Sequence, residues 1–466
     1  MHHSRVMAGA MTLLLLSAPA SWGAAPQKAK AVPTAEPFEG VVIAEGLAAP
    51  WDMVWGPDNH IWVSEREGSR IISVDPKTGE KKLVGSIPDV KVGPQHEGVL
   101  GIALDPDLGK NGSKNNVYIA HTYMDGGREH ARIVRFHYDP QTRKIADPKV
   151  ILSNMPAGDD RLRFGPDGKL YYSIGEQGHN QGANVCKPID AQRIPTKAEL
   201  DADDHSAYAG KVLRLNPDGG IPDDNPVING VRSHVYTYGH RNPQGLVFVG
   251  DLLFEAEHGP SSDDEINLLV AGGNYGWPHV AGFRDDQGYV YGNWSAAPDC
   301  EKLAKSYFPT DIPASVPQQK ETEWKAEDFR EPIKTFYTVP NSYNFRDGRC
   351  GDMAYLCWPT IAPSSVAYYP ANGPIPGWGN SLLVTSLKNG ALYRIPLNAD
   401  GKTAQGDVAK YFHTPNRYRS ALVSPDGKTI YVATDVRGNA LGNDGKPVND
   451  MKNPGSIIAF IYDAKQ

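Results

Sequence analysis

Two neighbouring polar stretches hold the side chains best suited to chemistry. The first reads YGHRNPQG at 238–245, and the second reads EHGPSSDDEIN at 257–267. Either stretch alone is explained more simply as a capped loop or a solvated acidic face. Both, however, precede GNYGWP at 273–278 and GFRDD at 282–286. Carboxylates mixed with turn carbonyls are the ligands that Ca²⁺ prefers, so this region is a candidate calcium-binding and catalytic segment.

Three cationic side chains later in the chain form a second candidate set. Lys388 and the pair Arg417 and Arg419 lie in predicted loops that follow strand-like runs. Guanidinium and ammonium groups that converge from separate elements bind polyanionic ligands through charge-assisted hydrogen bonds. Each residue taken singly is explained more simply as a solvated surface charge. The hypothesis therefore requires a fold that brings these loops together.

A repeated unit predicts such a fold. Six times, a polar turn opens into a short aromatic or aliphatic run. Proline fixes φ and glycine or asparagine accepts a positive φ, so each unit indicates a tight turn before a strand. Six units predict an all-β, six-bladed β-propeller, whose loops converge on a central channel. The turns are GPDN at 56–59, DPD at 105–107, GPDG at 165–168, VGD at 249–251, WGN at 378–380 and SPDG at 424–427.

Length, composition and charge agree with one propeller domain. The chain has 466 residues, including 48 glycines and 38 prolines, as expected for many short strands and turns. No long stretch keeps a helical period, and we expect only a short helix within an insertion at 196–208. The formal net charge of −7 is mild and unclustered, which argues against nucleic acid as a partner.

The N-terminus has the features of a secretory signal. Arg5 gives a positive start, 7–16 is an apolar core, and small residues at 23–25 offer a cleavage site. The apolar run is too short to span a bilayer, and no later segment is long and apolar enough to do so. We expect a signal peptide at 1–24, a flexible lead-in at 25–36 and the propeller domain at 37–466, in a periplasmic or secreted protein.

Export changes how the four cysteines are interpreted. Cys350 and Cys357 lie seven residues apart, and a local disulfide between them would stiffen a loop. Cys186 and Cys300 would form a second, long-range bridge. Metal binding is the alternative, but no Cys-x-x-Cys pair or nearby pair of histidines supports it. We predict two disulfides.

Five segments match one known family in the same order. They are GHRNPQG at 239–245, GPSSDDEIN at 259–267, GGNYGWP at 272–278, APSS at 362–365 and NRYR at 416–419. Together they resemble the soluble, pyrroloquinoline quinone (PQQ) dependent glucose dehydrogenases of the glucose/sorbosone dehydrogenase family. The resemblance implies a six-bladed propeller that binds PQQ and Ca²⁺. It further implies periplasmic oxidation of aldose sugars to lactones, with electrons passed to a quinone, cytochrome or dye acceptor.

The resemblance also implies roles for individual residues. Arg241 would hydrogen-bond the quinone carbonyl beside the carbon that accepts hydride and would stabilise the developing oxyanion. The main-chain carbonyls of Gly259 and Pro260 would help to bind the Ca²⁺ that polarises PQQ. Further cofactor contacts would come from Asn242, Thr360, Lys388, Arg417 and Arg419. The sugar would be flanked by Gln181, Tyr355 and Trp358.

A second calcium site is implied by the same resemblance, with a structural role and contacts to the partner subunit of a homodimer. Its residues would be Glu265, Tyr275, Ala281, Phe283, Asp285 and Glu321. Cys350 and Cys357 match the disulfide of the family.

One expected residue is absent. The family has a histidine shortly before the Arg-Leu that leads into Gly-Pro-Asp, and this base removes the proton from the anomeric hydroxyl. In this chain a short segment that includes the histidine is missing between Asp160 and Arg161. Asp160 still occupies the place of a cofactor-contacting aspartate. His96 aligns with a pocket glutamine and is a candidate substitute base, although a pocket-lining role without catalysis is the simpler interpretation.

The missing base keeps three functions open. A positioned base contributes about 10²- to 10⁴-fold to such a reaction, so the first is a PQQ-dependent aldose dehydrogenase with reduced or altered activity. The second is a non-catalytic relative that binds PQQ, calcium or sugar. The third is a calcium-dependent lactonase of propeller type, which requires a central Ca²⁺ held by carboxylate and asparagine side chains.

Overall fold

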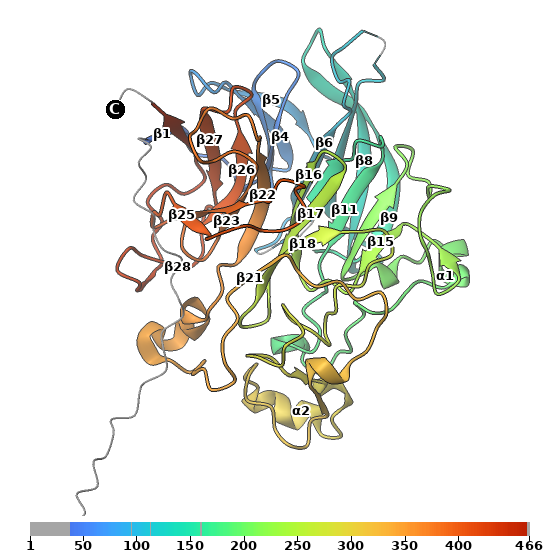
Figure 1. Cartoon of the computed structure of the whole chain (residues 1–466). Helices are drawn as coiled ribbons and strands as arrows, with labels where there is room; N and C mark the ends of the chain where they lie inside the picture. Colours follow the sequence, from blue (N-terminus) through green and yellow to red (C-terminus); the bar gives the residue numbers. More distant parts are fainter. Residues whose placement is uncertain (1–37, 95, 112, 159–160, 464–466) are drawn as a thin grey trace, which may run out of the picture.

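Six four-stranded antiparallel sheets surround a central axis in the computed structural model, which describes residues 38–94, 96–111, 113–158 and 161–463 (Figure 1). This arrangement is a six-bladed β-propeller and confirms the predicted fold class. The expected signal peptide and lead-in, as well as Asp160, lie outside the described residues. Within the described part of the chain, no helix is long and apolar enough to span a membrane.

Each blade runs from an innermost to an outermost strand. In this order, blades one to three are β2 (Pro50–Trp55), β3 (Ile61–Glu65), β4 (Arg70–Val74), β5 (Lys81–Ser86); β6 (Val99–Leu104), β7 (Asn116–Asp125), β8 (Arg128–Asp139), β9 (Lys144–Met155); and β10 (Arg161–Phe164), β11 (Leu170–Ile174), β12 (Lys211–Leu215), β15 (Val235–Tyr238). Blades four to six are β16 (Pro243–Val249), β17 (Leu252–Glu257), β18 (Asp264–Leu269), β21 (Lys334–Phe336); β22 (Pro363–Tyr369), β23 (Ser381–Ser386), β24 (Leu392–Pro396), β25 (Ala409–Tyr411); and β26 (Tyr418–Val423), β27 (Thr429–Thr434), β30 (Ile457–Tyr462), β1 (Phe38–Ala44).

The sixth blade closes the ring. Its outermost strand, β1, comes from the N-terminal end of the propeller and pairs with β30 from the C-terminal end, with Phe38 opposite Tyr462. The two ends of the domain are therefore held by one sheet, and no edge between first and last blade is left open.

The six predicted turn-and-strand units are the hairpins between the first and second strands of the six blades. Gly56 N donates to His60 O, Gly165 N to Lys169 O and Ser424 N to Thr429 O, so equivalent turns close in the same way. Because strand one of every blade ends at these turns, all six lie at the same end of the propeller. The loops at the other end are therefore available to form a binding or catalytic site.

Six hydrophobic clusters fill the spaces between neighbouring blades. Tyr118 and Ile133 of blade two, for example, pack with Tyr172 and Leu213 of blade three, all fully buried. The alternating strands thus bury their apolar side chains between sheets, which explains why one repeat cannot fold alone. Corresponding clusters occupy each of the other five boundaries.

The inner strands approach one another closely around the axis. A Cβ at Gly245 would lie 2.7 Å from the backbone nitrogen of Val366, so only glycine allows β16 to pack against β22 at this point. Arg161 of β10 fills the centre, where it is fully buried and donates to the carbonyls of Trp51, Gln244 and Ser364 from three other inner strands.

Short elements decorate the loops, and all but the small sheet at 227–232, which follows β12 at the end of the turns, lie at the opposite end. The predicted helix at 196–208 is confirmed as α1 (Lys197–Asp201), which Thr196 and Glu199 cap, followed by a 3-10 turn (Ser206–Tyr208). The remaining elements are the helix α2 (Cys300–Leu303); the 3-10 turns Gly182–Asn184, Trp294–Ala296, Ala304–Ser306, Glu321–Glu323 and Gly348–Cys357; and the small sheets β13–β14 (Val227–Ile228, Val231–Arg232), β19–β20 (Tyr291–Gly292, Gln318–Gln319) and β28–β29 (Ala440–Leu441, Pro447–Val448).

Both predicted disulfides are present. Cys186–Cys300 joins the loop after β11 to α2, and the cystine lies in a small apolar cluster with Val185 and Trp294. Cys350–Cys357 closes the 3-10 segment before β22. The structure thus favours disulfides over metal binding for all four cysteines.

Candidate active site

The predicted cofactor and substrate residues converge on one end of the propeller. They come from two kinds of loop, those that precede an inner strand and those that join a second strand to a third. Both kinds open at the end opposite the six turns. The residues in loops before inner strands are His96, Arg241, Asn242, Tyr355, Trp358, Thr360 and Arg417; those in loops between second and third strands are Gln181, Gly259, Pro260 and Lys388. Arg419 is the second residue of β26.

Arg241 lines a pocket at this end of the propeller. Residues of blades three and four hold its side chain in place. Its Nη2 donates to Gln181 Oε1 at 2.7 Å, and its Nη1 donates to His258 O at 3.2 Å. Its guanidinium carbon lies 5.5 Å from the ring centroid of Trp277. The Nε atom of Arg241 is buried without a hydrogen-bond partner among the described residues. Arg241 therefore keeps a donor for a ligand.

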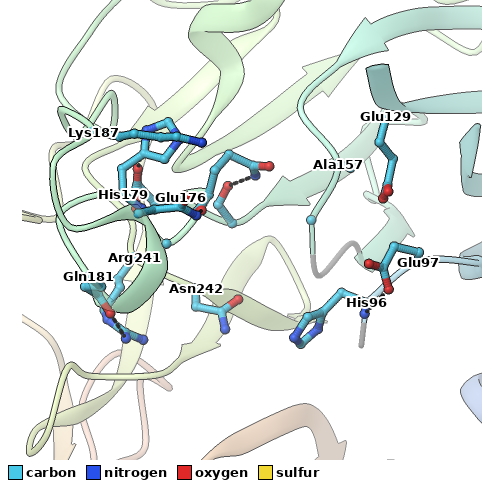
Figure 2. A pocket seen from close by; sticks show the side chains of 15 residues that line it. His96, Glu97, Glu129, Ala157, Glu176, His179, Gln181, Lys187, Arg241 and Asn242 are labelled. Atoms are coloured by element: carbon cyan, nitrogen blue, oxygen red, sulfur yellow. Dashed lines mark hydrogen bonds and ion pairs between the residues drawn. The ribbon is translucent and has the colours of Figure 1, made fainter. Parts of the chain in front are cut away.

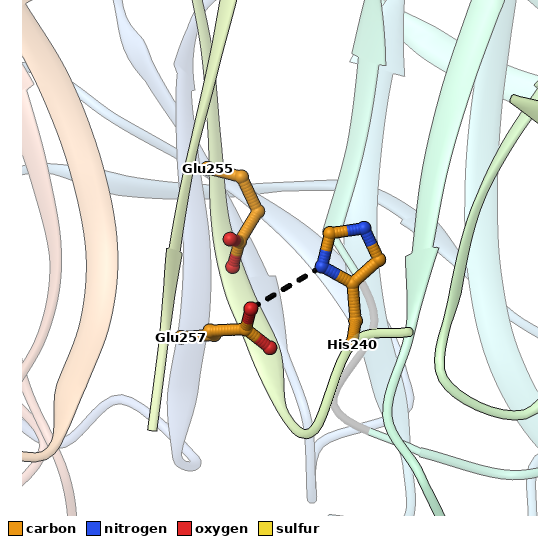
Figure 3. Close-up of side chains that lie close together, drawn as sticks. All are labelled: His240, Glu255 and Glu257. Carbon is orange, nitrogen blue, oxygen red and sulfur yellow. Dashed lines mark hydrogen bonds and ion pairs between the residues drawn. The ribbon is translucent and has the colours of Figure 1, made fainter. Parts of the chain in front are cut away.

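A buried acidic group under Arg241 fixes its backbone. Glu257 Oε2 accepts a hydrogen bond from Arg241 N at 2.7 Å, and Glu257 Oε1 lies 3.3 Å from His240 Nδ1 (Figure 3). Asn267 Nδ2 contacts Glu257, Glu255 and Glu265, each at 3.0 Å. Burial, and then the charge of Glu257, raise the pKa of Glu255 well above its ordinary value. The cluster anchors the loop that presents Arg241.

Arg417 and Arg419 meet at one carboxylate. Arg419 Nε donates to Asp435 Oδ1 at 2.8 Å, and Arg417 Nε donates to Asp435 Oδ2 at 3.1 Å. Burial alone would raise the pKa of Asp435, but Arg419 and Arg417 outweigh it and lower the pKa to about 2. Asp435 stays ionised and compensates one of two guanidinium charges, which leaves a net positive charge at this wall.

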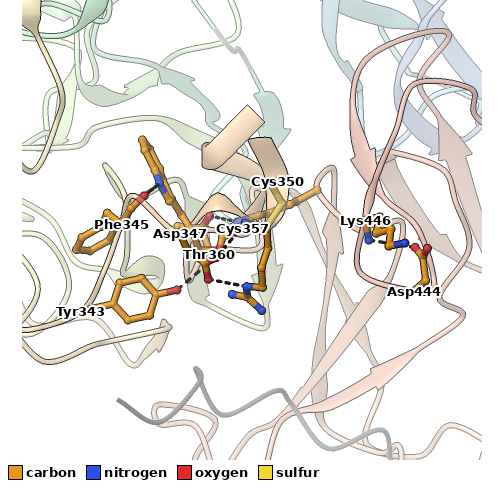
Figure 4. Close-up of a disulfide and its surroundings, with 11 residues drawn as sticks. Tyr343, Phe345, Asp347, Cys350, Cys357, Thr360, Asp444 and Lys446 are labelled. Carbon is orange, nitrogen blue, oxygen red and sulfur yellow. Dashed lines mark hydrogen bonds and ion pairs between the residues drawn. A yellow bond between two sulfur atoms is a disulfide. The ribbon is translucent and has the colours of Figure 1, made fainter. Parts of the chain in front are cut away.

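Lys388, Thr360 and Trp358 form a second cationic corner. Lys388 is buried, and its Nζ contacts Thr360 Oγ1 at 2.9 Å and also donates to the carbonyl of Trp358. The disulfide Cys350–Cys357 lies just before Trp358 and Thr360 (Figure 4). Trp358 Nε1 donates to Phe345 O at 2.9 Å. The disulfide and these contacts position the loop that precedes β22.

Contacts between blades connect these groups. Arg419 Nη1 donates to Gln244 Oε1 at 3.0 Å, which joins β26 to β16, the strand that follows Arg241. Asn439 Nδ2 donates to Tyr355 Oη at 2.8 Å, and Asn439 O accepts from Arg417 at 2.8 Å. The structure thus brings together the predicted cofactor and sugar residues that it describes. Tyr355 lies at the outer edge, 46% exposed.

The pocket beside Arg241 has a volume of about 740 Å³. Arg241, Asn242 and Gln181 lie on one wall, and His96 and Glu97 lie on the other (Figure 2). Asn242 Oδ1 is buried without a hydrogen-bond partner among the described residues. Glu176 also lines the pocket, although no sequence motif pointed to it. A weaker signal was available, because this acidic residue lies four positions after the strand-like run at 169–172 and five positions before Gln181.

His96 lies in the pocket as the sequence predicted, but its surroundings make it a weak base. Burial, followed by the charges of Arg419 and Arg66, lowers the pKa of His96 to about 4. The imidazole is therefore neutral at neutral pH and holds a proton poorly. The structure supports a pocket-lining role for His96 more strongly than a catalytic one.

The loop of Gly259 and Pro260 is shaped by its own backbone and by one aspartate. Asp264 Oδ1 accepts from Gly259 N at 2.9 Å, while Asp264 Oδ2 accepts from the backbone nitrogens of Ile361 and Ala362. A Cβ at Gly259 would lie 1.9 Å from Ser262 O, so the tight loop requires glycine. Gly259 and Pro260 line a small cavity together with Glu265, Tyr275 and Ala281. The residues predicted for the two calcium sites therefore adjoin.

The residues predicted for the second calcium site lie in and around the loop at 281–286. Glu265 Oε1 accepts from Gly282 N at 2.6 Å, and Glu321 accepts from Ala281 N at 3.0 Å and from Asp285 N at 3.3 Å. Burial, then the charges of Asp285 and Asp263, raise the pKa of Glu321 to about 8. Such crowded carboxylates fit a cation that would relieve their repulsion.

Two residues predicted for this calcium site are poorly suited to bind a cation through their side chains. Tyr275 directs its hydroxyl to Leu268 O at 2.7 Å and stacks its ring on His240. Phe283 has no side-chain oxygen and is 38% exposed. Both residues would have to offer main-chain carbonyls to a cation.

Comparison with known proteins decides the family. The sequence profile described as "Glucose / Sorbosone dehydrogenase" matches residues 47–328 and 344–443. The chain belongs to this family. It is 45% identical, over 98% of its length and 97% of the relative's, to quinoprotein glucose dehydrogenase B of Acinetobacter calcoaceticus.

Further comparisons agree with the assignment of this chain to the glucose/sorbosone dehydrogenase family. It is 30% identical to aldose sugar dehydrogenase YliI of Escherichia coli, over 84% of this chain and 89% of the relative. Among solved structures, the PQQ-bound aldose sugar dehydrogenase of Streptomyces coelicolor matches with a TM-score of 0.60 and 26% identity, over 92% of this chain and all of the other. The family member is thus a sugar dehydrogenase, an oxidoreductase.

Proposed function

We propose that the protein oxidises aldose sugars of the glucose type at the anomeric carbon to lactones, in a reaction that depends on PQQ and Ca²⁺. The observation that carries the proposal is the convergence of Arg241, Lys388, Arg417 and Arg419 at one end of the propeller. Four cationic side chains from blades four to six face a single region that also contains the predicted sugar contacts.

The groups present fit a planar polyanion such as PQQ. Asp435 compensates one of the guanidinium groups of Arg417 and Arg419, so the other remains for a ligand carboxylate. The unpartnered Nε of Arg241 and Oδ1 of Asn242 offer a donor and an acceptor at the pocket wall. Buried polar atoms without partners are costly, and a bound ligand would satisfy them.

The chain's own residues have distinct tasks in this proposal. Arg241 stabilises negative charge that develops on a carbonyl oxygen, and the hydrogen bond to Gln181 holds its guanidinium in place. Thr360 and Lys388 orient a ligand at the opposite corner, and Trp358 and Tyr355 flank the sugar. PQQ supplies the two-electron acceptor to which the hydrogen at the anomeric carbon is transferred as hydride.

Two kinds of calcium site belong to the proposal. The carbonyls of Gly259 and Pro260 would help to hold the ion that acts on the cofactor, and Glu265, Glu321 and the 281–285 loop would hold a structural ion. The donor sets are oxygen atoms, as Ca²⁺ prefers. Export, which the signal features at the N-terminus support, belongs to the proposal as well. A quinone or cytochrome electron acceptor and a homodimer complete it and rest on the resemblance alone.

The structure argues against the lactonase alternative. That function needs carboxylate and asparagine side chains around a central cation, whereas the centre of this propeller holds the guanidinium groups of Arg161 and Arg419. A divalent cation placed beside these two guanidinium groups would be repelled.

Reconstitution tests the proposal directly. The purified protein is loaded with PQQ and Ca²⁺, glucose is added, and the absorbance of the cofactor is followed with and without a dye acceptor. We expect reduction of PQQ and formation of gluconolactone. PQQ that binds with high affinity but stays oxidised with every aldose tested would contradict the proposal and favour the non-catalytic binding protein.

A further inference from the structure

The loop between β11 and β12 brings a buried carboxylate to the wall of the pocket that contains Arg241. Glu176 is 7% exposed, and its Oε2 accepts a hydrogen bond from the backbone nitrogen of His179 at 3.1 Å. Its Oε1 is buried and has no hydrogen-bond partner in the described part of the chain. His179 Nδ1 lies 3.6 Å from that atom but donates its hydrogen to Pro188 O at 2.8 Å. One oxygen of Glu176 is thus left without a donor.

The charges around Glu176 come from several elements. Arg241 faces it from the loop before β16, Lys211 from β12, Asp190 from the insertion and Tyr291 from β19. Burial raises the pKa of Glu176 to about 7, and the positive charge of Arg241 is the largest influence that opposes the rise. A base whose pKa is close to the working pH combines a useful ionised fraction with sufficient basicity.

We propose that Glu176 is the general base of this enzyme and takes the proton of the anomeric hydroxyl. The inference rests on the proposed function. As the sugar is oxidised, the C1–H bond breaks and its hydrogen leaves with the electron pair as hydride to the two-electron quinone acceptor. The O1–H bond breaks and its proton passes to Glu176, while a C1=O double bond forms. The sugar loses two electrons, which the quinone gains.

The geometry distinguishes Glu176 from three other titratable groups of the pocket. Glu97 and Glu129 lie across the pocket from Arg241, whereas Glu176 lies on the same side as Arg241 (Figure 2). His96 is a weak base because of burial beside two guanidinium groups. Glu176 therefore meets the two requirements for the role, a location beside the oxyanion-stabilising arginine and an oxygen atom free to accept a proton.

Three variants test the assignment in the holoenzyme. Glu176→Gln keeps the size and removes the base, Glu176→Asp keeps a carboxylate, and Glu39→Gln is a matched control at an exposed position of β1. We expect single-turnover reduction of PQQ by glucose to fall about 10²- to 10⁴-fold in Glu176→Gln, to fall less in Glu176→Asp and to stay unchanged in Glu39→Gln. The wild-type rate should rise through a pKa close to 7, and this rise should disappear in Glu176→Gln.

A readout without turnover completes the test. PQQ affinity should be the same in Glu176→Gln and in wild type. The infrared difference spectrum between the apo forms of wild type and Glu176→Gln should contain a protonated carboxyl band that titrates near pH 7, because the raised pKa values of Asp264 and Glu321 are common to both proteins. Reduction at the wild-type rate in Glu176→Gln, with wild type active, would overturn the base assignment and leave the proposed function intact. An inactive wild type would overturn both. If Glu176→Gln does not fold, a pH-independent rate in Glu176→Asp would overturn the assignment.

Discussion

Arg241 Nη2 and Gln181 Oε1 lie 2.7 Å apart and join blade four to the insertion of blade three. The two residues are 60 positions apart in the chain, and the hydrogen bond lets each loop help to orient the side chain of the other. One is expected to act on the cofactor and the other on the sugar. The hydrogen bond therefore couples the position of the oxyanion-stabilising group to the part of the pocket where the substrate binds.

We predict different kinetic effects for the two partners. Arg241→Lys keeps a charge but loses the guanidinium fork, and kcat should fall about 10²- to 10³-fold because a preorganised donor is removed. Gln181→Ala should raise KM, on the order of tenfold, because it removes one expected contact to the sugar. It should lower kcat less than Arg241→Lys does, because His258 O still holds the guanidinium of Arg241. Steady-state kinetics with glucose and a dye acceptor checks both. Equal losses of kcat in the two variants would contradict this division of roles.

Asp435 should contribute to stability in a pH-dependent way. Its pKa is lowered to about 2 in the folded protein, against 3.8 for the ordinary carboxyl. Because the folded pKa is depressed, the contribution is complete above pH 3.8, and it is lost as the pH falls through 2. The shift corresponds to about 2 kcal/mol of the free energy of unfolding.

The variant Asp435→Asn checks this contribution. We expect it to be destabilised near neutral pH and to show a smaller loss of stability than wild type between pH 4 and pH 2. Denaturant unfolding at several pH values gives the slopes. A wild-type slope retained in Asp435→Asn would assign the acid sensitivity to another carboxylate, such as the buried Asp52, whose pKa burial would raise but Arg163 and Arg161 lower.

Removal of calcium should lower the melting temperature. If free Ca²⁺ exceeds Kd a hundredfold, the bound ion stabilises the folded protein by about 3 kcal/mol, because it binds the folded state alone. Glu265→Gln and Glu321→Gln should reduce the effect of a chelator, since both glutamates are buried around the 281–286 loop. Scanning calorimetry with chelator, then with Ca²⁺ or Mg²⁺ restored, measures it. Recovery with Mg²⁺ as complete as with Ca²⁺ would not agree with the predicted sites.

The long-range disulfide should stabilise the insertion locally. Cys186 and Cys300 are 114 residues apart, and closure of so long a loop restricts the unfolded chain by up to about 5 kcal/mol. In Cys186→Ser/Cys300→Ser, proteolysis should cut near α2 before the blades unfold. Cys350→Ser/Cys357→Ser is the contrasting pair, because it should loosen the loop of Tyr355 and Trp358 and change KM more than stability. The same pattern of proteolysis in both double variants would contradict this difference between the two disulfides.

Much of the architecture and of the site was predictable from local patterns. Each turn such as GPDG at 165–168 is a local structure, and the short run behind it at 170–174 is buried on both faces of its sheet. The helix at Lys197–Asp201 was predictable from a short local segment. The two disulfides were predictable because four cysteines can pair in only a few ways. The cationic residues Lys388, Arg417 and Arg419 were recognisable by type, because a polyanionic ligand requires them.

The role of each titratable group was decided by tertiary structure. In the sequence, His96 has the better ordinary pKa and Glu176 is one acidic residue among 54. Burial beside Arg419 and Arg66 lowers the pKa of His96, whereas burial with one unpartnered oxygen raises that of Glu176. Residue types and turns are local properties that the chain determines alone. Desolvation and the field of charges from other blades exist only after the ring has closed.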